Sequence, residues 1–120
     1  MDQAWALEQA FWKEAVEGNP TGFYARHMTA DGFVVLPNRI ASRNELLSRW
    51  PELEAIRSYD LSEPNFTLLE GGNVVITYHL AVEASWLANY EAFVTSLYTW
   101  GVKSWQLIFR VHTPKGSFPF

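Results

Sequence analysis

The stretch SLYTWGVKSWQLIFRVHTP, Ser96 to Pro114, decides the fold of this chain more than any other. Two runs of strand-forming residues flank a short polar turn at residues 101–104, which predicts a β-hairpin. Two sets of residues alternate along the second run: Trp105, Leu107, Phe109 and Val111 on one side, and Gln106, Ile108, Arg110 and His112 on the other. A period of two is typical of a strand that has one drier face.

The composition is that of one domain with a large core. The chain has 120 residues, of which 48% are hydrophobic and 16% aromatic, and it contains six tryptophans. Because each large aromatic side chain buries much surface, a few of them suffice to fill a core or to line an apolar pocket. We therefore interpret residues 1–120 as a single domain.

Charge and residue usage exclude several classes of function. The net charge is −4 and no basic stripe is present, so no nucleic-acid partner is expected. The absence of cysteine removes disulfides, thiolate catalysis and cysteine-based metal sites. His27, His79 and His112 are scattered without ligand spacing, so no metal is expected, with a three-histidine site assembled from distant strands as the alternative. The sequence has no phosphate-binding loop, nucleophile elbow or zinc-protease motif, and no cofactor is expected either.

The expected location of the protein rests on its first residues and on its hydropathy. The N-terminus carries acidic residues and lacks the basic region of a signal peptide. No apolar run approaches the ~20 residues of a membrane span. The sequence therefore predicts a cytoplasmic protein with no membrane partner.

The first half of the sequence predicts helices. Residues 2–17 have the period of an amphipathic helix. Its apolar stripe comprises Ala4, Leu7, Phe11 and Ala15, with Trp5 and Trp12 beside it. Glu8 is assigned to a position off this stripe, and Gly18 is expected to end the helix. Asn19 and Pro20 then predict the start of a short second helix that runs to about residue 27.

A turn, a short strand and a third helix are predicted next. Asp31-Gly32 is interpreted as a turn, followed by a buried strand over residues 33–37. Ser42 and Glu45 form a capping-box pattern, which predicts a helix that continues to Trp50 and ends at Pro51.

The second half predicts an antiparallel meander. A strand over residues 57–70 is expected to be broken or bulged at Pro64, and residues 71–73 form a hairpin turn. A long strand follows over 74–85, with Val74, Ile76, Tyr78, Leu80 and Val82 on one face. A loop over 86–89 leads to a strand over 90–102 and then to the closing hairpin. Helices followed by an antiparallel meander indicate the α+β class.

In this order the segments resemble the NTF2-like superfamily, within its small SnoaL-like or DUF4440-like proteins. Four segments carry the resemblance: HMTADGFVVLPN, SRNELLSRW, NVVITYHL and YTWGVKSWQLIFRVHTP. The resemblance implies a cystatin-like α+β cone in which three N-terminal helices pack on a curved antiparallel sheet. It further implies an apolar cavity between the helices and the concave face of the sheet, and a homodimer formed through the other face.

Several residues are candidates for the lining of that cavity, each with a structural alternative. The ligand-pocket candidates are Trp12, Tyr24, Tyr78, Tyr98, Trp100 and Arg110. Tyr78 lies on the apolar side of its strand, so its hydroxyl needs a partner whether it belongs to a core or to a pocket. Tyr98 and Trp100 share one strand face and fit a cavity wall, the core or a dimer contact equally well. Arg110 is interpreted as a solvated or interface residue, or else as a cavity cation suited to a carboxylate ligand.

Candidate catalytic groups are fewer, and the catalytic residues stay unknown. Asp31 lies near the first strand, with the alternative of a turn residue that accepts backbone N–H bonds. His79 has a side chain that titrates near neutral pH, with the alternative of a structural or interface histidine. Ketosteroid-isomerase-like relatives use a tyrosine on the first helix, and Phe11 or Trp12 stands near that place here, which speaks against a direct transfer of their mechanism.

Three functional hypotheses follow, and the sequence leaves open whether the protein is an enzyme. The first is a protein that binds a small apolar or weakly acidic molecule in an aromatic-lined cavity. The second is a cofactor-free isomerase, dehydratase or cyclase, which requires a carboxylate or histidine with a raised or near-neutral pKa in the cavity. The third is a dimeric interaction module whose cavity is plugged by bulky side chains.

Overall fold

The computed structural model of the chain describes residues 2–17, 20–49, 56–84 and 87–116. The described residues form three helices: α1 (Asp2–Glu17), α2 (Thr21–His27) and α3 (Arg43–Arg49). They also form six strands: β1 (Met28–Leu36), β2 (Arg39–Ser42), β3 (Ile56–Leu69), β4 (Asn73–Ala84), β5 (Leu87–Trp100) and β6 (Trp105–Pro114). None of these helices has both the length and the apolar character that a membrane crossing requires. The cytoplasmic location stays a prediction.

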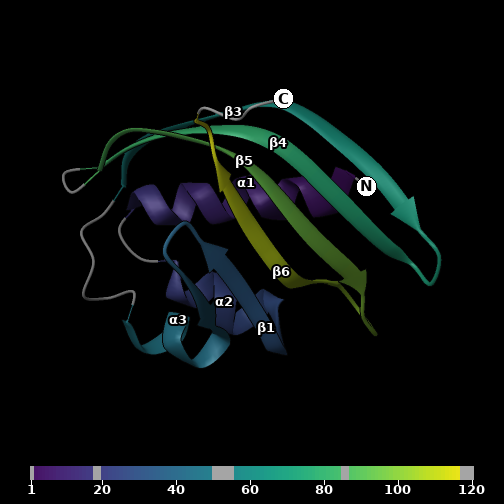
Figure 1. Cartoon of the computed structure of the whole chain (residues 1–120). Helices are drawn as coiled ribbons and strands as arrows, with labels where there is room; N and C mark the ends of the chain where they lie inside the picture. Colours follow the sequence, from purple (N-terminus) through teal and green to yellow (C-terminus); the bar gives the residue numbers. More distant parts are fainter. Residues whose placement is uncertain (1, 18–19, 50–55, 85–86, 117–120) are drawn as a thin grey trace.

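The six strands form one curved sheet in the order β2-β1-β6-β5-β4-β3. The pair β1–β6 is parallel and the other pairs are antiparallel. The three helices lie on the same side of the sheet, and the longest, α1, runs beneath its curved centre (Figure 1). The α+β class and the cone of helices under a curved sheet are therefore confirmed.

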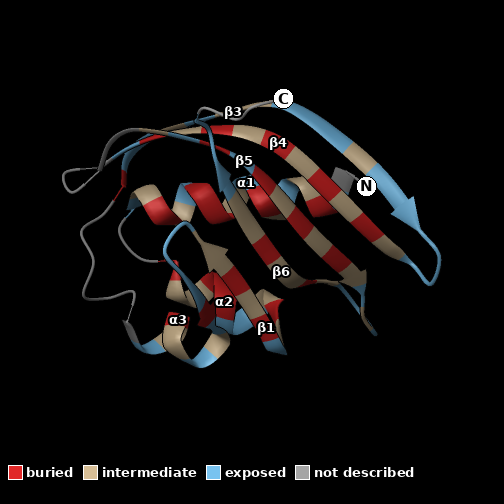
Figure 2. Cartoon of the chain, viewed as in Figure 1, coloured by how far each residue is buried: buried red, intermediate tan, exposed pale blue. Residues whose placement is uncertain are grey.

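Buried and partly buried positions alternate along the central strands, as Figure 2 shows for β4 and β5. On β4 the buried set is the predicted one: Val74, Ile76, Tyr78, Leu80 and Val82. Because side chains on a strand alternate between faces, this set covers the concave side above α1. The core of the molecule lies in this layer between α1 and the sheet.

The predicted first helix is confirmed, but the position of Glu8 on it is not. Ala4, Phe11 and Ala15 are buried as expected. Glu8 is buried as well, at 0% exposure. Residue 8 lies four positions after Ala4 and three before Phe11, so it belongs to the middle of the buried stripe.

The predicted alternation of the last strand is wrong because β6 contains a bulge. Leu97 is paired with Phe109, whereas Tyr98 is paired with Leu107, so Ile108 is an extra residue in the ladder. A bulge of one residue reverses which face the following side chains occupy. Leu107 and Arg110 consequently share the buried concave face, each at 0% exposure. The assignment of Arg110 to a solvated or interface face is therefore wrong.

The predicted turn at Asp31-Gly32 is also wrong, since both residues lie within β1. The pairing of β1 with β6 is irregular between Met28 and Phe33, and these two residues fall in that irregular stretch. Gly32 is required there by close approach: a Cβ on it would stand 2.3 Å from Cγ of Met28. The turn residues seen in the sequence thus mark an irregular strand.

Other local predictions are confirmed. Ser42 caps α3, since its hydroxyl accepts a hydrogen bond from the Glu45 N–H at 3.2 Å. Gly71 and Gly72 form the β3–β4 turn with φ of +81° and +79°, a backbone conformation that favours glycine. The register of β3 shifts between Ser62 and Asn65, which brackets the predicted break at Pro64.

The ends of several elements differ from the predictions or cannot be compared with them. Residues 87–89, predicted as loop, belong to β5, and β5 ends at Trp100 rather than at residue 102. The predicted helix and strand ends at Gly18, Asn19, Trp50, Pro51 and Trp86 lie outside the described residues.

Candidate functional site

A buried ion pair joins the first helix to the last strand. Glu8 of α1 and Arg110 of β6 are both fully buried. Arg110 donates two parallel hydrogen bonds, from Nε to Oε2 at 2.9 Å and from Nη2 to Oε1 at 2.8 Å. This fork-to-fork geometry is the strong form of a charge-assisted contact.

Three hydroxyl groups complete the shell around the Glu8 carboxylate. Tyr78 and Ser96 donate to Oε2 at 2.5 and 2.7 Å. Tyr98 donates to Oε1 at 2.7 Å. With the two bonds from Arg110, the carboxylate accepts five hydrogen bonds, so its lone pairs are used within the protein.

Aromatic side chains enclose the guanidinium and connect it to neighbouring elements. Its Nη1 donates to the Tyr24 hydroxyl at 3.2 Å, and its Cζ lies 3.9 Å from the ring centre of Phe11. Trp12 donates from Nε1 to the Tyr78 hydroxyl at 2.8 Å. We call Glu8, Arg110 and the four hydroxyl side chains of Tyr24, Tyr78, Ser96 and Tyr98 the Glu8–Arg110 network.

The network stabilises the ionised form of Glu8 and the neutral form of its tyrosines. Burial on its own raises the pKa of Glu8, but the charge of Arg110 and the hydrogen bonds outweigh it and lower the pKa to about 2. Burial raises the pKa of Tyr78 and Tyr98 well above the ordinary value, and the charge of Glu8 adds to this. At neutral pH the Glu8 carboxylate is thus ionised, and its lone pairs already accept hydrogen bonds from the protein. It is therefore poorly suited to act as a general base.

Beside the network lies a cavity of about 540 Å3. The helices contribute Phe11, Trp12, Tyr24 and Leu46 to its lining. The strands and the β1–β2 turn contribute Val34, Leu36, Pro37, Asn38, Arg39, Ile56, Val82, Tyr90, His112 and Pro114. Pro37, Asn38, Arg39 and Pro114 are exposed and form the rim. A mostly apolar hollow of this size with few polar groups is typical of a small-molecule site.

Two polar side chains stand together in this lining, Tyr90 of β5 and His112 of β6. The Tyr90 hydroxyl lies 3.2 Å from Nδ1 of His112, and the two rings are stacked with centres 6.0 Å apart. Burial, reinforced by the charge of Arg110, lowers the pKa of His112 to about 4. Burial raises the pKa of Tyr90 to about 12. Both side chains are therefore neutral near pH 7.

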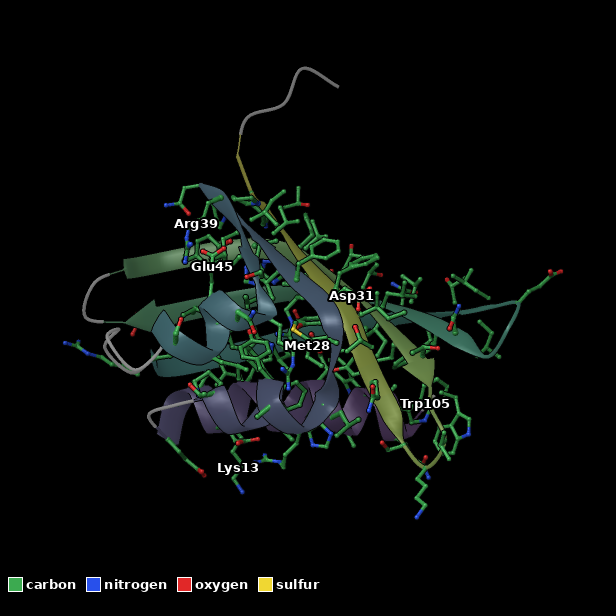
Figure 3. The ribbon with its side chains drawn as sticks, turned by 90° about the horizontal axis from the view of Figure 1, so that it is seen from below. Lys13, Met28, Asp31, Arg39, Glu45 and Trp105 are labelled. Atoms are coloured by element: carbon green, nitrogen blue, oxygen red, sulfur yellow. The ribbon has the colours of Figure 1, made fainter. Side chains whose placement is uncertain are left out.

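The predicted ligand-pocket residues occupy three places. Trp12 and Tyr24 line the cavity. Tyr78, Tyr98 and Arg110 belong to the Glu8–Arg110 network beneath it. Trp100 is half exposed and meets Trp105 edge to face, and Figure 3 shows Trp105 at the end of the molecule opposite Arg39 and Glu45.

The two catalytic candidates lie outside the cavity lining. Asp31 is exposed on β1 (Figure 3). His79 is on the outer face of β4, with Nδ1 3.3 Å from the Ser62 hydroxyl and Nε2 2.9 Å from Oε1 of Glu91. Among the described residues, no group of three or more His, Asp or Glu side chains has an arrangement that could hold a metal ion.

Comparison with solved structures identifies the architecture. An NTF2-like protein from Cytophaga hutchinsonii aligns with a TM-score of 0.83 and 12% identity, over 95% of this chain and 97% of that one. A protein with a cystatin-like fold from Caulobacter vibrioides aligns with a TM-score of 0.78 and 17% identity, over 96% and 89%. The chain has the NTF2-like fold.

A third structure with the NTF2-like fold carries a provisional assignment of activity. This protein, from Streptomyces avermitilis, is provisionally assigned as a dehydratase of the NTF2-like family. It aligns with a TM-score of 0.75 and 16% identity, over 97% of this chain and 96% of that one. No protein-family model and no curated protein matches the chain. Because one fold carries many functions, this likeness defines the architecture and not the activity.

Sequence reasoning missed four residues that shape the interior of this NTF2-like cone. The predicted apolar stripe of the first helix omits Glu8. Ser96 is not among the predicted site residues, although it alternates with the buried Val94 and Tyr98. His112 and Tyr90 are 22 residues apart in the chain, and the pairing of β5 with β6 brings them together. The alternation of β5 was the available signal for Ser96.

Proposed function

We propose that the protein binds a small, mainly apolar molecule in the cavity between its helices and the concave face of its sheet. The observation that carries this proposal is the cavity of about 540 Å3, whose walls include Phe11, Trp12 and Tyr24. Its volume is within the range of ligand pockets, roughly 300–1,000 Å3. A cavity with room for a ligand also speaks against the hypothesis of an interaction module plugged by bulky side chains.

The polar groups favour binding over catalysis. A cofactor-free isomerase, dehydratase or cyclase needs an acid or base that titrates near the working pH. The pKa of Glu8 is lowered to about 2, mainly because the charge of Arg110 outweighs burial, and that of His112 is lowered to about 4 by burial. The enzyme hypothesis is supported by one of the similar structures, which is provisionally assigned as a dehydratase.

The test uses a neutral fluorescent probe, N-phenyl-1-naphthylamine, whose emission rises in apolar surroundings. We expect saturable binding by the wild type. Leu36→Trp places a large ring in the cavity lining and should weaken binding by about tenfold or more, a change of about 1.4 kcal/mol. Leu68→Trp is the matched control, since Leu68 is 65% exposed on β3 and outside the lining. Equal binding by both variants, or none by the wild type, contradicts the proposal.

We further propose that two copies associate through the outer face of the sheet. Residues opposite one another in the ladder place an apolar row there, formed by Phe33, Phe109, Leu97 and Val75, with the pair Val35 and Val111 beside it. The helices lie on the other side of the sheet (Figure 1), and Phe93 on the outer face is 49% exposed. The six residues are partly exposed. An apolar patch on a sheet face that no helix covers is the kind of surface that forms an interface.

Sedimentation velocity tests this association. The wild type is expected to sediment as a dimer, and Phe93→Glu should shift it toward the monomer because it buries a charge in the interface. Val102→Glu, at the 96% exposed tip of the β5–β6 turn, is the matched control and should remain dimeric. A monomeric wild type at high protein concentration contradicts the proposed dimer.

A further inference from the structure

Most polar side chains in the described part of the cavity lining have partners within the protein, and Asn38 at the exposed rim is the exception. The Trp12 indole donates to Tyr78, and the Tyr24 hydroxyl accepts from Arg110. At the rim, Arg39 is bound to Glu45 at 2.6 Å, and Figure 3 labels both residues at the same end of the molecule. Among the lining residues that the structure describes, the side-chain polar groups inside the rim that remain for a ligand belong to Tyr90 and His112.

The hydrogen bond between Tyr90 and His112 leaves one donor free in either tautomer of the imidazole. If the Tyr90 hydroxyl donates to Nδ1, then Nε2 carries the ring hydrogen and is the free donor. If Nδ1–H donates to the Tyr90 oxygen, the hydroxyl hydrogen is free and Nε2 is an acceptor. Nε2 forms no hydrogen bond with the part of the chain that the structure describes, and it is not among the fully buried polar atoms.

The charges around the pair select against an ionic ligand. Arg110 is the nearest buried cation, and its charge is matched by the two-bond contact with Glu8. Arg39, the cation of the rim, is paired with Glu45. A carboxylate that entered the cavity would therefore lose its hydration without meeting an unpaired cation among the described residues. A neutral oxygen loses much less hydration and can accept the free donor.

We propose that His112 and Tyr90 form the recognition point of the cavity, at which an uncharged, mainly apolar molecule is held through a single carbonyl or hydroxyl oxygen. This inference rests on the proposed binding function. It narrows the expected ligand from an apolar or weakly acidic molecule to a neutral one with one hydrogen-bonding oxygen. His112 and Tyr90 are its specificity-determining residues.

The experiment compares ligands of one shape that differ in a single group: naphthalene, 2-naphthol and 2-naphthoate. Each is titrated against bound N-phenyl-1-naphthylamine in the full chain at pH 7. We expect 2-naphthol to bind about three- to tenfold more tightly than naphthalene, as one net hydrogen bond allows, and 2-naphthoate to bind more weakly than 2-naphthol. In His112→Phe the advantage of 2-naphthol over naphthalene should disappear, while naphthalene keeps its affinity.

Two further variants make the outcome decisive. Tyr90→Phe removes only the hydroxyl and should reduce the advantage of 2-naphthol, which serves if His112→Phe does not fold by circular dichroism. His79→Phe replaces the histidine on the outer face and should leave the advantage unchanged. Equal binding of naphthalene and 2-naphthol, or tightest binding of 2-naphthoate, overturns the recognition point while the binding function stands. If none of the ligands displaces the probe and the probe itself does not bind, both proposals fail.

Discussion

The Glu8–Arg110 network and the His112–Tyr90 pair differ in how fully their hydrogen bonds are satisfied, although Trp12 contacts both. Trp12 donates to Tyr78 in the network, and its ring centre lies 6.2 Å from that of His112 in the cavity. The network is fully buried and its carboxylate accepts five hydrogen bonds. The pair shares one hydrogen bond and faces open space.

This difference separates two roles of polar groups inside one cone, a structural role and a role in binding. A buried charge whose partners are all internal fixes the arrangement of the elements that supply them, here α1, β4, β5 and β6. A neutral pair with a free donor has capacity left for a ligand. The network should therefore govern stability, and the pair should govern specificity.

The largest expected effect comes from breaking the buried ion pair. Glu8→Gln removes the carboxylate and leaves the Arg110 charge buried without its partner. The free energy of unfolding should fall by about 3 to 5 kcal/mol. Glu14→Gln is the matched control on the same helix, because Glu14 pairs with Arg26 at the surface and should contribute about 0 to 1 kcal/mol. Urea unfolding followed by circular dichroism measures both.

A double substitution separates the unpaired charge from the rest of the loss. Glu8→Met combined with Arg110→Met removes both charges and should be less destabilising than the sum of the single changes, by about 0.5 to 3 kcal/mol. The double variant should still be less stable than the wild type, because the hydroxyls of Tyr78, Ser96 and Tyr98 lose their acceptor. Strict additivity would show that the two side chains are not coupled.

The sequence predicted the fold better than it predicted the difference between the Glu8–Arg110 network and the His112–Tyr90 pair. The periodicities of α1 and β4 and the turn at Gly71-Gly72 are local signals, and each agrees with the structure. The network depends on a bulge at Ile108, which turns Arg110 inward against the alternation of its own strand. A bulge arises from strand pairing over long range, so the period of one strand does not reveal it.

The His112–Tyr90 pair could not be predicted from the sequence for a similar reason. Its two members come from neighbouring strands, and their neutrality is produced by burial and by Arg110, neither of which the local sequence shows. The sequence did predict an apolar cavity, through the family resemblance. It could not predict which polar groups inside the cone would already have partners.

The next largest effect is a dependence of stability on pH that originates at His112. Burial lowers the pKa of His112 from 6.5 to about 4, with Arg110 adding to the shift and Glu8 opposing it. Between these values the unfolded chain binds a proton that the folded chain does not, so stability falls as the pH falls from 6.5 to 4. The loss due to His112 should be about 3 kcal/mol, at about 1.4 kcal/mol per pH unit.

His112→Phe tests the origin of this loss. The variant should lose about 3 kcal/mol less than the wild type between pH 7.5 and 4, measured by urea unfolding at each pH. A second decline below pH 4.5 should persist in both proteins, because the pKa of Glu8 is lowered from 4.5 to about 2 and its stabilisation is lost as the carboxylate is protonated. If the free energy of unfolding changes with pH in the same way in both proteins above pH 4.5, His112 is not the origin of the loss.

The smallest effects set one tyrosine of each region against the other. Tyr98→Phe removes a hydrogen bond to a buried carboxylate and should lower the free energy of unfolding by about 1.5 to 3 kcal/mol. Tyr90→Phe removes a bond between neutral groups beside open space and should lower it by about 1 kcal/mol or less. Binding should show the reverse order: Tyr90→Phe reduces the preference for 2-naphthol over naphthalene, and Tyr98→Phe leaves it intact. Because both changes delete one hydroxyl from a tyrosine on β5, side-chain type and strand are held constant. If Tyr90→Phe proves as destabilising as Tyr98→Phe and leaves binding unchanged, the cavity pair is a second structural cluster and the distinction between the two regions fails.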